Sequence, residues 1–232
     1  MVNSRALPAD APDAAVPGLV LLCKRPALGH AKQRLAATLG KERALILANA
    51  LLECALEDLC QWPGASVIAP DNSVHLEWAR SLAPGAHCLA QAEGNLGQRL
   101  NALDINLRNQ GMRQLMFIGS DCPALTPGDY RNVKSLLQDF DTVLLNARDG
   151  GVVLMASNQP WPDLTSLPWS TGDLGAALAQ LCRLAGQRVA VAGESFDIDI
   201  AADLPLLQEA LTNDPRPARR RLLDHLQIQS NA

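Results

Sequence analysis

Seven short apolar runs, separated by segments of helical periodicity, constrain the fold of this chain more than any other feature. The apolar runs span residues 19–23, 66–69, 87–90, 115–118, 142–145, 152–155 and 189–192. Between them, leucine and alanine recur every three or four residues in the stretches 45–59, 96–107 and 174–185. This alternation is typical of a parallel sheet that amphipathic helices cover. The sequence therefore predicts an α/β fold, with a three-layer α/β/α sandwich around a mostly parallel sheet.

Length and composition favour one globular domain. The chain has 232 residues, of which 48% are hydrophobic and 19% are charged, and no internal repeat or long polar linker divides it. We predict a loose N-terminal tail at residues 1–17 and a single α/β domain at residues 18–213. The basic segment 214–232 is expected to form a solvated C-terminal tail or a short helix on the surface.

Composition also excludes several classes of protein. The longest apolar runs are far shorter than the about 18 to 20 residues that cross a bilayer, so no membrane span is expected. The N-terminus lacks the basic start and apolar centre of a secretory signal, and six cysteines without a CxxC pair are typical of reduced thiols. We therefore expect a cytoplasmic protein. The net charge of −4 argues against a nucleic-acid partner.

A basic loop follows the first apolar run. Lys24, Arg25, Lys32 and Arg34 lie within eleven residues that contain no acid, and a proline and a glycine make this segment irregular. Ligands of parallel α/β sheets bind beyond the carboxyl ends of the strands. The loop is therefore a candidate site for a diphosphate, and the alternative is a solvated basic loop.

Acidic residues follow two other apolar runs. Asp121 comes three residues after the end of the fourth run, and Asp197 and Asp199 come shortly after the seventh. In an extended chain, the period of two places Asp197 and Asp199 on one face, where they repel each other unless a cation or protons neutralise them. Carboxylates suit Mg²⁺ or Mn²⁺, which makes the three residues candidate metal ligands. The alternatives are that Asp121 caps a turn and that Asp199 caps a helix starting near Ala201.

A fourth candidate segment follows the fifth run. Asp149 precedes Gly150 and Gly151, and it could serve as a base or orient an acceptor hydroxyl; the alternative is an aspartate in a turn. Gln91 and Arg99 are weaker candidates for contacts with a base or a ribose.

Other catalytic motifs are absent from the sequence. The chain has no GxxxxGK[ST] loop, no GxSxG elbow and no dinucleotide fingerprint. Cys122 is not expected to be a nucleophile, because the carboxylate of Asp121 beside it opposes thiolate formation.

Six segments in order carry a resemblance to a known family. They are KRPALGHAKQRLA, QAEGNLGQRL, IGSDCPALTP, DTVLLNARDGG, LPWST and FDIDIAADL, and the resemblance runs from about Leu19 to Leu207. The chain resembles a bacterial family of GT-A-like transferases, called selenodomain-associated transferase 1, within the nucleotide-diphospho-sugar transferase superfamily. It is more distantly similar to 2-phospholactate and molybdenum-cofactor guanylyltransferases.

The resemblance implies three groups of site residues and a divalent cation, Mg²⁺ or Mn²⁺. It implies that the nucleotide phosphates face Lys24, Lys32 and Arg34, and that Asp121, Asp197 and Asp199 hold the metal. It also implies that an acceptor pocket is bordered by Asp149, Gly150, Gly151, Trp169, Ser170 and Thr171. The family usually has threonine at Gln33, a carboxylate at Arg148 and aromatic residues at Val152 and Val153, so the acceptor end departs from its pattern.

Three functions follow as hypotheses. The first is metal-dependent transfer of a sugar from a nucleotide sugar to a small-molecule acceptor. The second is nucleotidyl transfer from an NTP to a phosphorylated small molecule. The third is nucleotide binding by a protein that has lost catalysis, for which the altered acceptor end is the motive. A fold of this kind supports each of them.

Overall fold

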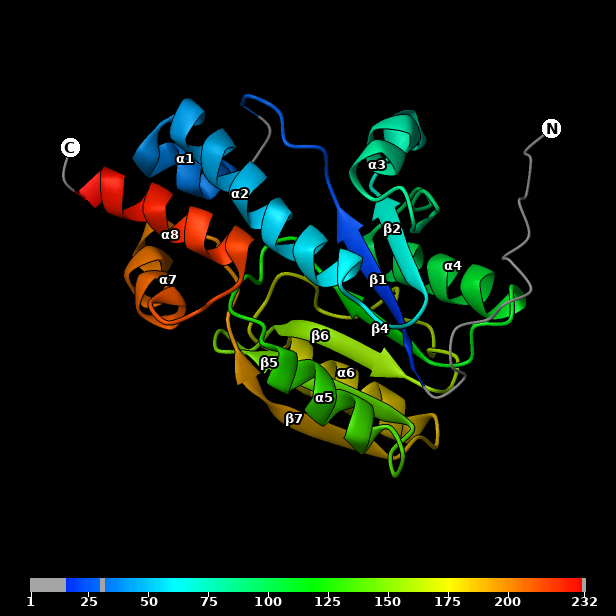
Figure 1. Ribbon diagram of the computed structural model, residues 1–232. Coiled ribbons are helices and arrows are strands. Elements are labelled where there is room, and N and C mark those ends of the chain that lie inside the picture. Colours follow the sequence, from blue (N-terminus) through cyan, green and yellow to red (C-terminus); the bar gives the residue numbers. More distant parts are fainter. Residues whose placement is uncertain (1–15, 30–31, 231–232) are drawn as a thin grey trace.

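A seven-stranded sheet forms the centre of the protein (Figure 1). The structure is a computed structural model that describes residues 16–29 and 32–230. The strands are β1 (Gly18–Cys23), β2 (Ser66–Pro70), β3 (His87–Cys88), β4 (Leu115–Ile118), β5 (Thr142–Ala147), β6 (Val152–Ser157) and β7 (Val189–Ser195), in the spatial order β3-β2-β1-β4-β6-β5-β7. Only β6 runs antiparallel to its neighbours β4 and β5. The predicted mostly parallel sheet is therefore confirmed.

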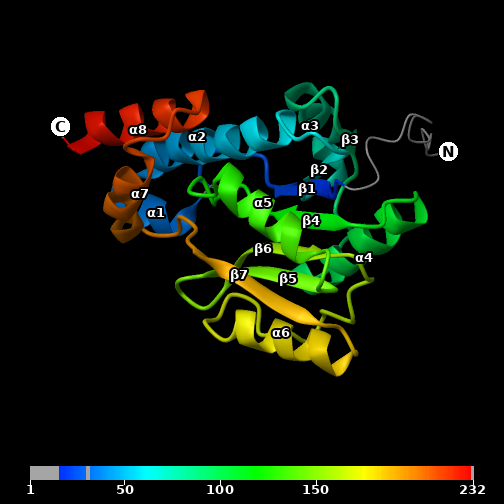
Figure 2. The same ribbon diagram turned by 60° about the horizontal axis from the view of Figure 1, so that its bottom comes forward.

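Helices cover both faces of the sheet, as Figures 1 and 2 show. One face packs against α2 (Lys41–Cys60), α3 (Leu76–Leu82) and α5 (Pro127–Leu136), and the other against α4 (Leu96–Asn109) and α6 (Leu174–Leu184). The apolar run of β1 serves both faces, because Leu19 and Leu21 belong to one core cluster and Val20 to the other. This is the predicted three-layer α/β/α sandwich.

The predicted start of α5 is confirmed in detail. Thr126 is the N-cap, Pro127 is the first helical residue, and Asp129 accepts hydrogen bonds from the backbone and hydroxyl of Thr126. By contrast, β3 is shorter than the run 87–90, because this edge strand pairs with β2 at only two positions.

A further helical cluster lies beyond the sheet. It contains α1 (Gln33–Leu39), α7 (Leu204–Leu211) and α8 (Pro217–Ser230), which pack on the outer part of α2. The described residues also form two short 3₁₀ helices, η1 (Ser73–His75) and η2 (Ala201–Asp203). In the part of the chain that the structure describes, none of the helices has the length and apolarity needed to cross a membrane.

The expectation of a solvated basic C-terminus is wrong for two of its arginines. Arg216, just before α8, and Arg219 on α8 are buried and pair with Asp58 of α2 at 3.0 and 2.6 Å. Charge alone suggested a solvated segment, but acids from α2 neutralise these arginines in the fold. The expected N-terminal tail at 1–17 mostly lies outside the described residues, which begin at Val16.

Candidate functional site

A cavity of about 780 Å³ opens at the edge of the sheet where β1, β2 and β4 end. It is the place at which ligands of parallel α/β sheets bind. Eight of the predicted site residues line it: Lys24, Arg25, Lys32, Gln91, Arg99, Asp121, Trp169 and Asp197. Residues from the first loop, from the segment after β4 and from the segment after β7 therefore border one space.

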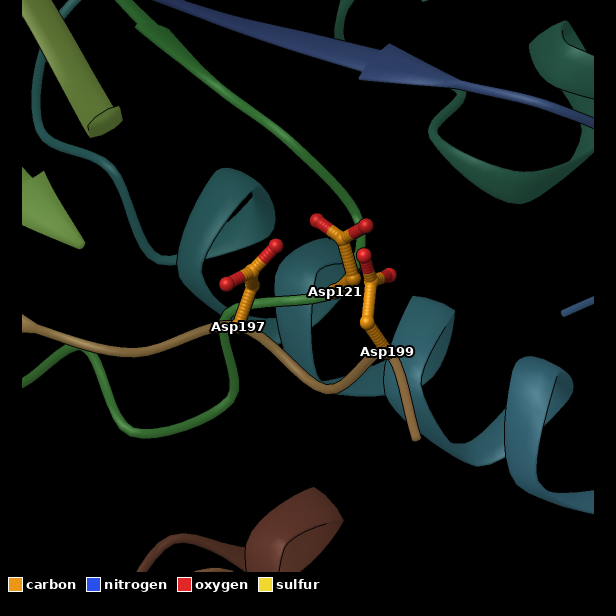
Figure 3. Close-up of side chains that lie close together, drawn as sticks. All are labelled: Asp121, Asp197 and Asp199. Atoms are coloured by element: carbon orange, nitrogen blue, oxygen red, sulfur yellow. The ribbon is translucent and has the colours of Figure 1, made fainter. Parts of the chain in front are cut away.

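Three carboxylates meet beside this cavity, and two of them, Asp121 and Asp197, line it, whereas Asp199 does not. Asp121 follows β4, and Asp197 and Asp199 lie on the extended segment between β7 and η2. One carboxylate oxygen from each lies within 4.8 Å of the others, and Figure 3 shows the three side chains converging. The backbone joins the two segments, since the amide of Ile198 donates to the carbonyl of Asp121 at 3.0 Å. Asp121 and Asp197, which are about 76 residues apart in the sequence, are thus held side by side.

Buried apolar residues that alternate with Asp197 and Asp199 explain the direction of these two carboxylates. Phe196 and Ile198 are buried, the latter completely, in the cluster formed with α1, α2, α7 and α8. The alternation predicted from the sequence turns Asp197 and Asp199 toward the opposite side, although the structure assigns no strand there. Asp199 does not cap the following helix. Asp203 does so instead, accepting from the amides of Asp199 and Ile200 at 2.8 Å each.

Burial and nearby charges shift the pKa values of two groups at this site, Asp197 and Cys122. Burial raises the pKa of Asp197 to about 6, with further contributions from the charges of Asp121 and Asp199. Burial, and then the charges of Asp121 and Asp197, also raise the pKa of the Cys122 thiol well above its ordinary value. This agrees with the expectation that Cys122 is no nucleophile.

Two basic side chains contact the acids, Lys32 from the end of the first loop and Arg34 from the start of α1. The ammonium Nζ of Lys32 lies 2.9 Å from Oδ2 of Asp121 and 3.2 Å from Oδ1 of Asp199. Arg34 places Nη1 3.4 Å from Oδ2 of Asp199. Burial alone would lower the pKa of Lys32, but Asp121 and Asp199 outweigh it and raise this pKa above the ordinary value. The structure thus brings together the basic loop and both acidic segments.

Asp197→Asn is expected to stabilise the metal-free protein. Because the pKa of Asp197 is raised in the folded state from 3.8 to about 6, this group stabilises the fold most below pH 3.8 and loses that contribution as the pH rises through about 6. Partial exposure of Asp197 to solvent weakens the effect of its charge. The substitution should therefore raise the free energy of unfolding by about 1 kcal/mol at pH 7, which raises Tm by roughly 2–4 °C. Thermal melts in EDTA at pH 7 and pH 4 check this. A lower Tm at pH 7, or a gain that persists at pH 4, would contradict the assigned repulsion.

The loop around Asp149 lies beside the cavity wall rather than in it. Oδ1 of Asp149 accepts from the amide of Gly151 at 2.9 Å, so this carboxylate has the turn contact that was considered as its alternative role. Asp149 also contributes to raising the pKa of Asp197, after burial and the nearer acids, which places the two carboxylates within electrostatic range. Among the residues proposed for the acceptor pocket, Trp169 lines the cavity, while the lining does not include Asp149, Gly150, Gly151, Ser170 or Thr171.

Gly150 has a structural requirement of its own. Its φ is +89°, and a Cβ added there would lie 1.9 Å from the carbonyl oxygen of Gly172, so the turn after β5 touches the segment before α6. The amide of Gly175 donates to the carbonyl of Gly150 at 2.9 Å and fixes this contact. Only glycine satisfies both the positive φ and the close approach.

Gly150→Ala is therefore expected to destabilise the protein by about 3 kcal/mol, the sum of an unfavourable φ and a backbone clash. Gly186→Ala is the matched control, because its φ of +83° is similar but no atom lies within 4 Å of the added Cβ. The control should lose only about 1 kcal/mol. Urea denaturation compares the two variants, and equal losses would show that the contact with Gly172 is unimportant.

One acidic residue of the cavity was missed by the sequence analysis. Asp71 lines the cavity directly after β2, where its carboxylate pairs with His75 at 3.2 Å. The rule that points to residues just after each strand would have found it.

Three of the four positions that depart from the family pattern, Gln33, Val152 and Val153, also line the cavity. The fourth, Arg148, pairs with Glu194 at 3.6 Å and lies over the ring of Phe196.

The donor set fits a divalent cation. Carboxylate oxygens are the ligands that Mg²⁺ and Mn²⁺ prefer, and three of them lie close enough together to share one ion. After burial, the charges of Asp121 and Asp199 contribute to the raised pKa of Asp197, and a bound cation would relieve this repulsion. Asp121, Asp197 and Asp199 are the residues that could hold it.

Comparison with known proteins identifies the family. The profile of the family described as an uncharacterized protein conserved in bacteria (DUF2064) matches residues 54–171, which is just over half of the chain. The chain belongs to the DUF2064 family. The matched region includes Asp121, Asp149 and Trp169, while the basic first loop and the segment of Asp197 and Asp199 lie outside it. The comparison with curated proteins finds no match.

Solved structures share the fold of this DUF2064 member. A candidate nucleotide-diphospho-sugar transferase from Desulfovibrio desulfuricans G20 is 22% identical, with a TM-score of 0.82 over 92% of this chain and 95% of that chain. A cytidylyltransferase from Leptospira borgpetersenii is 9% identical, with a TM-score of 0.52 over 92% and 94%. A CMP:2-keto-3-deoxy-manno-octonic acid synthetase complexed with CTP is 12% identical, with a TM-score of 0.50 over 85% and 99%. The fold is therefore that of the nucleotide-diphospho-sugar transferases.

Proposed function

We propose that the protein is a transferase that uses a nucleotide-activated donor, and that it moves the sugar of a nucleoside-diphosphate sugar to a small-molecule acceptor with the help of Mg²⁺ or Mn²⁺. One observation carries this proposal. Lys32 at the end of the first loop contacts Asp121 and Asp199 from two distant segments, and Lys32 and Asp121 line a single large cavity. Arg34 of α1 adds a second positive charge beside Asp199. A polyphosphate with a divalent cation is a ligand that needs both kinds of side chain at one place.

The size and lining of the cavity support a ligand of this class. A volume of about 780 Å³ suits a molecule as large as a nucleotide sugar. Gln91 and Arg99 lie in the same wall, where they suit contacts with the base or the ribose. The fold shared with the candidate transferase of Desulfovibrio desulfuricans is consistent with such a donor.

The three aspartates and the four basic residues would have distinct roles. Asp121, Asp197 and Asp199 would hold the cation, which when bound would offset the negative charge of the diphosphate leaving group. Lys24, Arg25, Lys32 and Arg34 would bind and orient the same diphosphate and stabilise its developing charge.

For Asp149 we propose the role of the base that accepts the proton of the acceptor hydroxyl. Oδ1 of Asp149 accepts a hydrogen bond from the amide of Gly151, and this contact fixes the direction of the carboxylate. Its other oxygen, Oδ2, accepts no hydrogen bond from the described residues, which leaves it available for the proton of a hydroxyl. We assign the neighbouring Gly150, Gly151, Trp169, Ser170 and Thr171 to the acceptor side.

Isothermal titration with UDP, GDP and their sugars tests the proposal. With MnCl₂ present, at least one nucleoside diphosphate should bind, and in EDTA its affinity should fall at least roughly 10-fold. Absence of binding to the Mn²⁺-loaded protein and to the metal-free protein alike would contradict the proposed donor class.

Nucleotidyl transfer is a second candidate. The fold similarity to the cytidylyltransferase of Leptospira borgpetersenii and to the synthetase complexed with CTP favours it. In that reaction a phosphorylated small molecule attacks the α-phosphate of an NTP, and pyrophosphate leaves. Release of pyrophosphate from an NTP in the presence of pooled phosphorylated metabolites distinguishes it from sugar transfer. Nucleotide binding without turnover across a broad acceptor panel would instead indicate a protein that has lost catalysis.

A further inference from the structure

Lys32 lies between two of the three acids that are proposed to hold the cation. Its ammonium contacts carboxylate oxygens of Asp121 and Asp199 at 2.9 and 3.2 Å, and its side chain is only 17% exposed. An ammonium ion and a divalent cation repel each other strongly at such short range, and both seek the same oxygens. The position of Lys32 is therefore incompatible with a cation bound to Asp121 and Asp199 together.

The backbone of Lys32 is in an unusual conformation. With φ of 43° and ψ of 59°, it is left-handed, and only one other non-glycine residue, Ser170, has a positive φ in the described part of the chain. This conformation is unfavourable for a residue with a side chain and persists where the surroundings hold it. As the N-cap of α1, Lys32 makes no side-chain cap hydrogen bond. Its carbonyl accepts a hydrogen bond from the amide of Ala36 in α1 at 2.9 Å, and the two ion pairs hold its side chain. Loss of those pairs therefore frees the ammonium to move.

We propose that Lys32 is an exchangeable counter-ion, which neutralises Asp121 and Asp199 in the free protein and moves to the donor diphosphate when a divalent cation takes its place. This inference rests on the proposed function for the nature of the donor. Its consequence is that the cation and the nucleotide bind as a coupled pair. The free protein binds the cation weakly, because the cation must displace Lys32, and the diphosphate strengthens cation binding, because it offers the displaced ammonium a new partner.

Lys32→Met separates this role from a simple phosphate contact. It removes the charge and keeps an unbranched side chain of similar length. The variant should bind MnCl₂ alone at least roughly 10-fold more tightly than the wild type, and a nucleoside diphosphate in saturating MnCl₂ at least roughly 10-fold more weakly. A residue that contacts only phosphate would change the second affinity and leave the first unaltered.

Lys24→Met is the matched control. Lys24 lines the same cavity, but no ion pair of Lys24 is found in the described portion of the structure. This variant removes the same charge, and it should change the affinity for MnCl₂ alone less than roughly 3-fold. If both variants bind Mn²⁺ equally more tightly, the effect is that of net charge, and the counter-ion role of Lys32 is overturned.

The measurement is the concentration of free Mn²⁺ by electron paramagnetic resonance, with circular dichroism as the check on folding. Unchanged or weaker Mn²⁺ binding by Lys32→Met overturns the inference, as does the absence of Mn²⁺ binding by every variant. Should Lys32→Met fail to fold, the wild type decides: its Mn²⁺ affinity should rise at least roughly 10-fold when UDP or GDP is added, and an unchanged affinity overturns the coupling. If no nucleoside diphosphate binds at all, the proposed function fails, while the Mn²⁺ titrations of the two lysine variants still test the counter-ion.

Discussion

Asp121→Ala is expected to abolish metal-dependent nucleotide binding while leaving the stability of the protein nearly unchanged. Asp121 lines the cavity, belongs to the candidate cation site and contacts Lys32, so its removal should weaken Mn²⁺-dependent binding of a nucleoside diphosphate by at least roughly 100-fold. Its side chain is 33% exposed, and loss of the pair with Lys32 is offset by relief of the repulsion from Asp197 and Asp199. The free energy of unfolding should therefore change by less than about 1 kcal/mol.

Asp129→Ala is the control for Asp121→Ala. Asp129 lies eight residues further along and closes the capping box of α5, accepting from the amide and the hydroxyl of Thr126 at 2.8 and 2.7 Å. Its loss should lower stability by about 1 kcal/mol and leave Mn²⁺-dependent binding intact. Thermal melts and calorimetric titrations of both variants give the comparison. A large loss of stability in Asp121→Ala with unaltered binding would make Asp121 a structural residue.

Arg219→Met is expected to destabilise the protein by about 3–5 kcal/mol. The guanidinium of Arg219 is completely buried, pairs with Glu57 at 3.0 Å and Asp58 at 2.6 Å, and donates to the carbonyls of Cys54 and Pro123. A methionine fills a similar volume but leaves these buried acids with less compensating charge. The midpoint of urea denaturation should fall accordingly.

Arg221→Met provides the matched comparison on the same helix. Arg221 is 57% exposed and pairs with Glu53 at 3.2 Å, so its loss should change stability by no more than about 0.5 kcal/mol. Equal effects of the two substitutions would contradict the role given to the buried network.

The buried arginines also contact the loop that carries Asp121. Arg219 donates to the carbonyl of Pro123, and Arg216 donates to the carbonyl of Leu125.

The sheet could be predicted from the sequence because local patterns determine it. Seven apolar runs became seven strands, and three helical stripes became α2, α4 and α6. The direction of Asp197 and Asp199 also followed from a local pattern, since the apolar Phe196 and Ile198 that alternate with them are buried on the other side. These predictions needed only the periodicity of a few neighbouring residues.

Contacts between distant segments could not be predicted in the same way. The pairing of Arg219 with Glu57 and Asp58 joins residues about 160 positions apart, so the basic C-terminus looked like a solvated segment. Likewise, the contact of Lys32 with Asp121 and Asp199 depends on how the first loop folds over the ends of the strands. Periodicity predicts which face a side chain takes, but it carries no information on which distant side chain lies there.

The central claim is that the acids of two distant segments and the cations of the first loop bind one polyphosphate through one divalent ion. A crystal structure with UDP or GDP and MnCl₂ tests it most directly, because the anomalous signal of manganese locates the ion independently of the protein. The expected result is a manganese peak about 2 Å from an oxygen of Asp121 and from Asp197 or Asp199, with a phosphate oxygen on the ion and Lys32 on the diphosphate. A diphosphate bound away from these three acids, or a manganese ion elsewhere in the cavity, would contradict the claim.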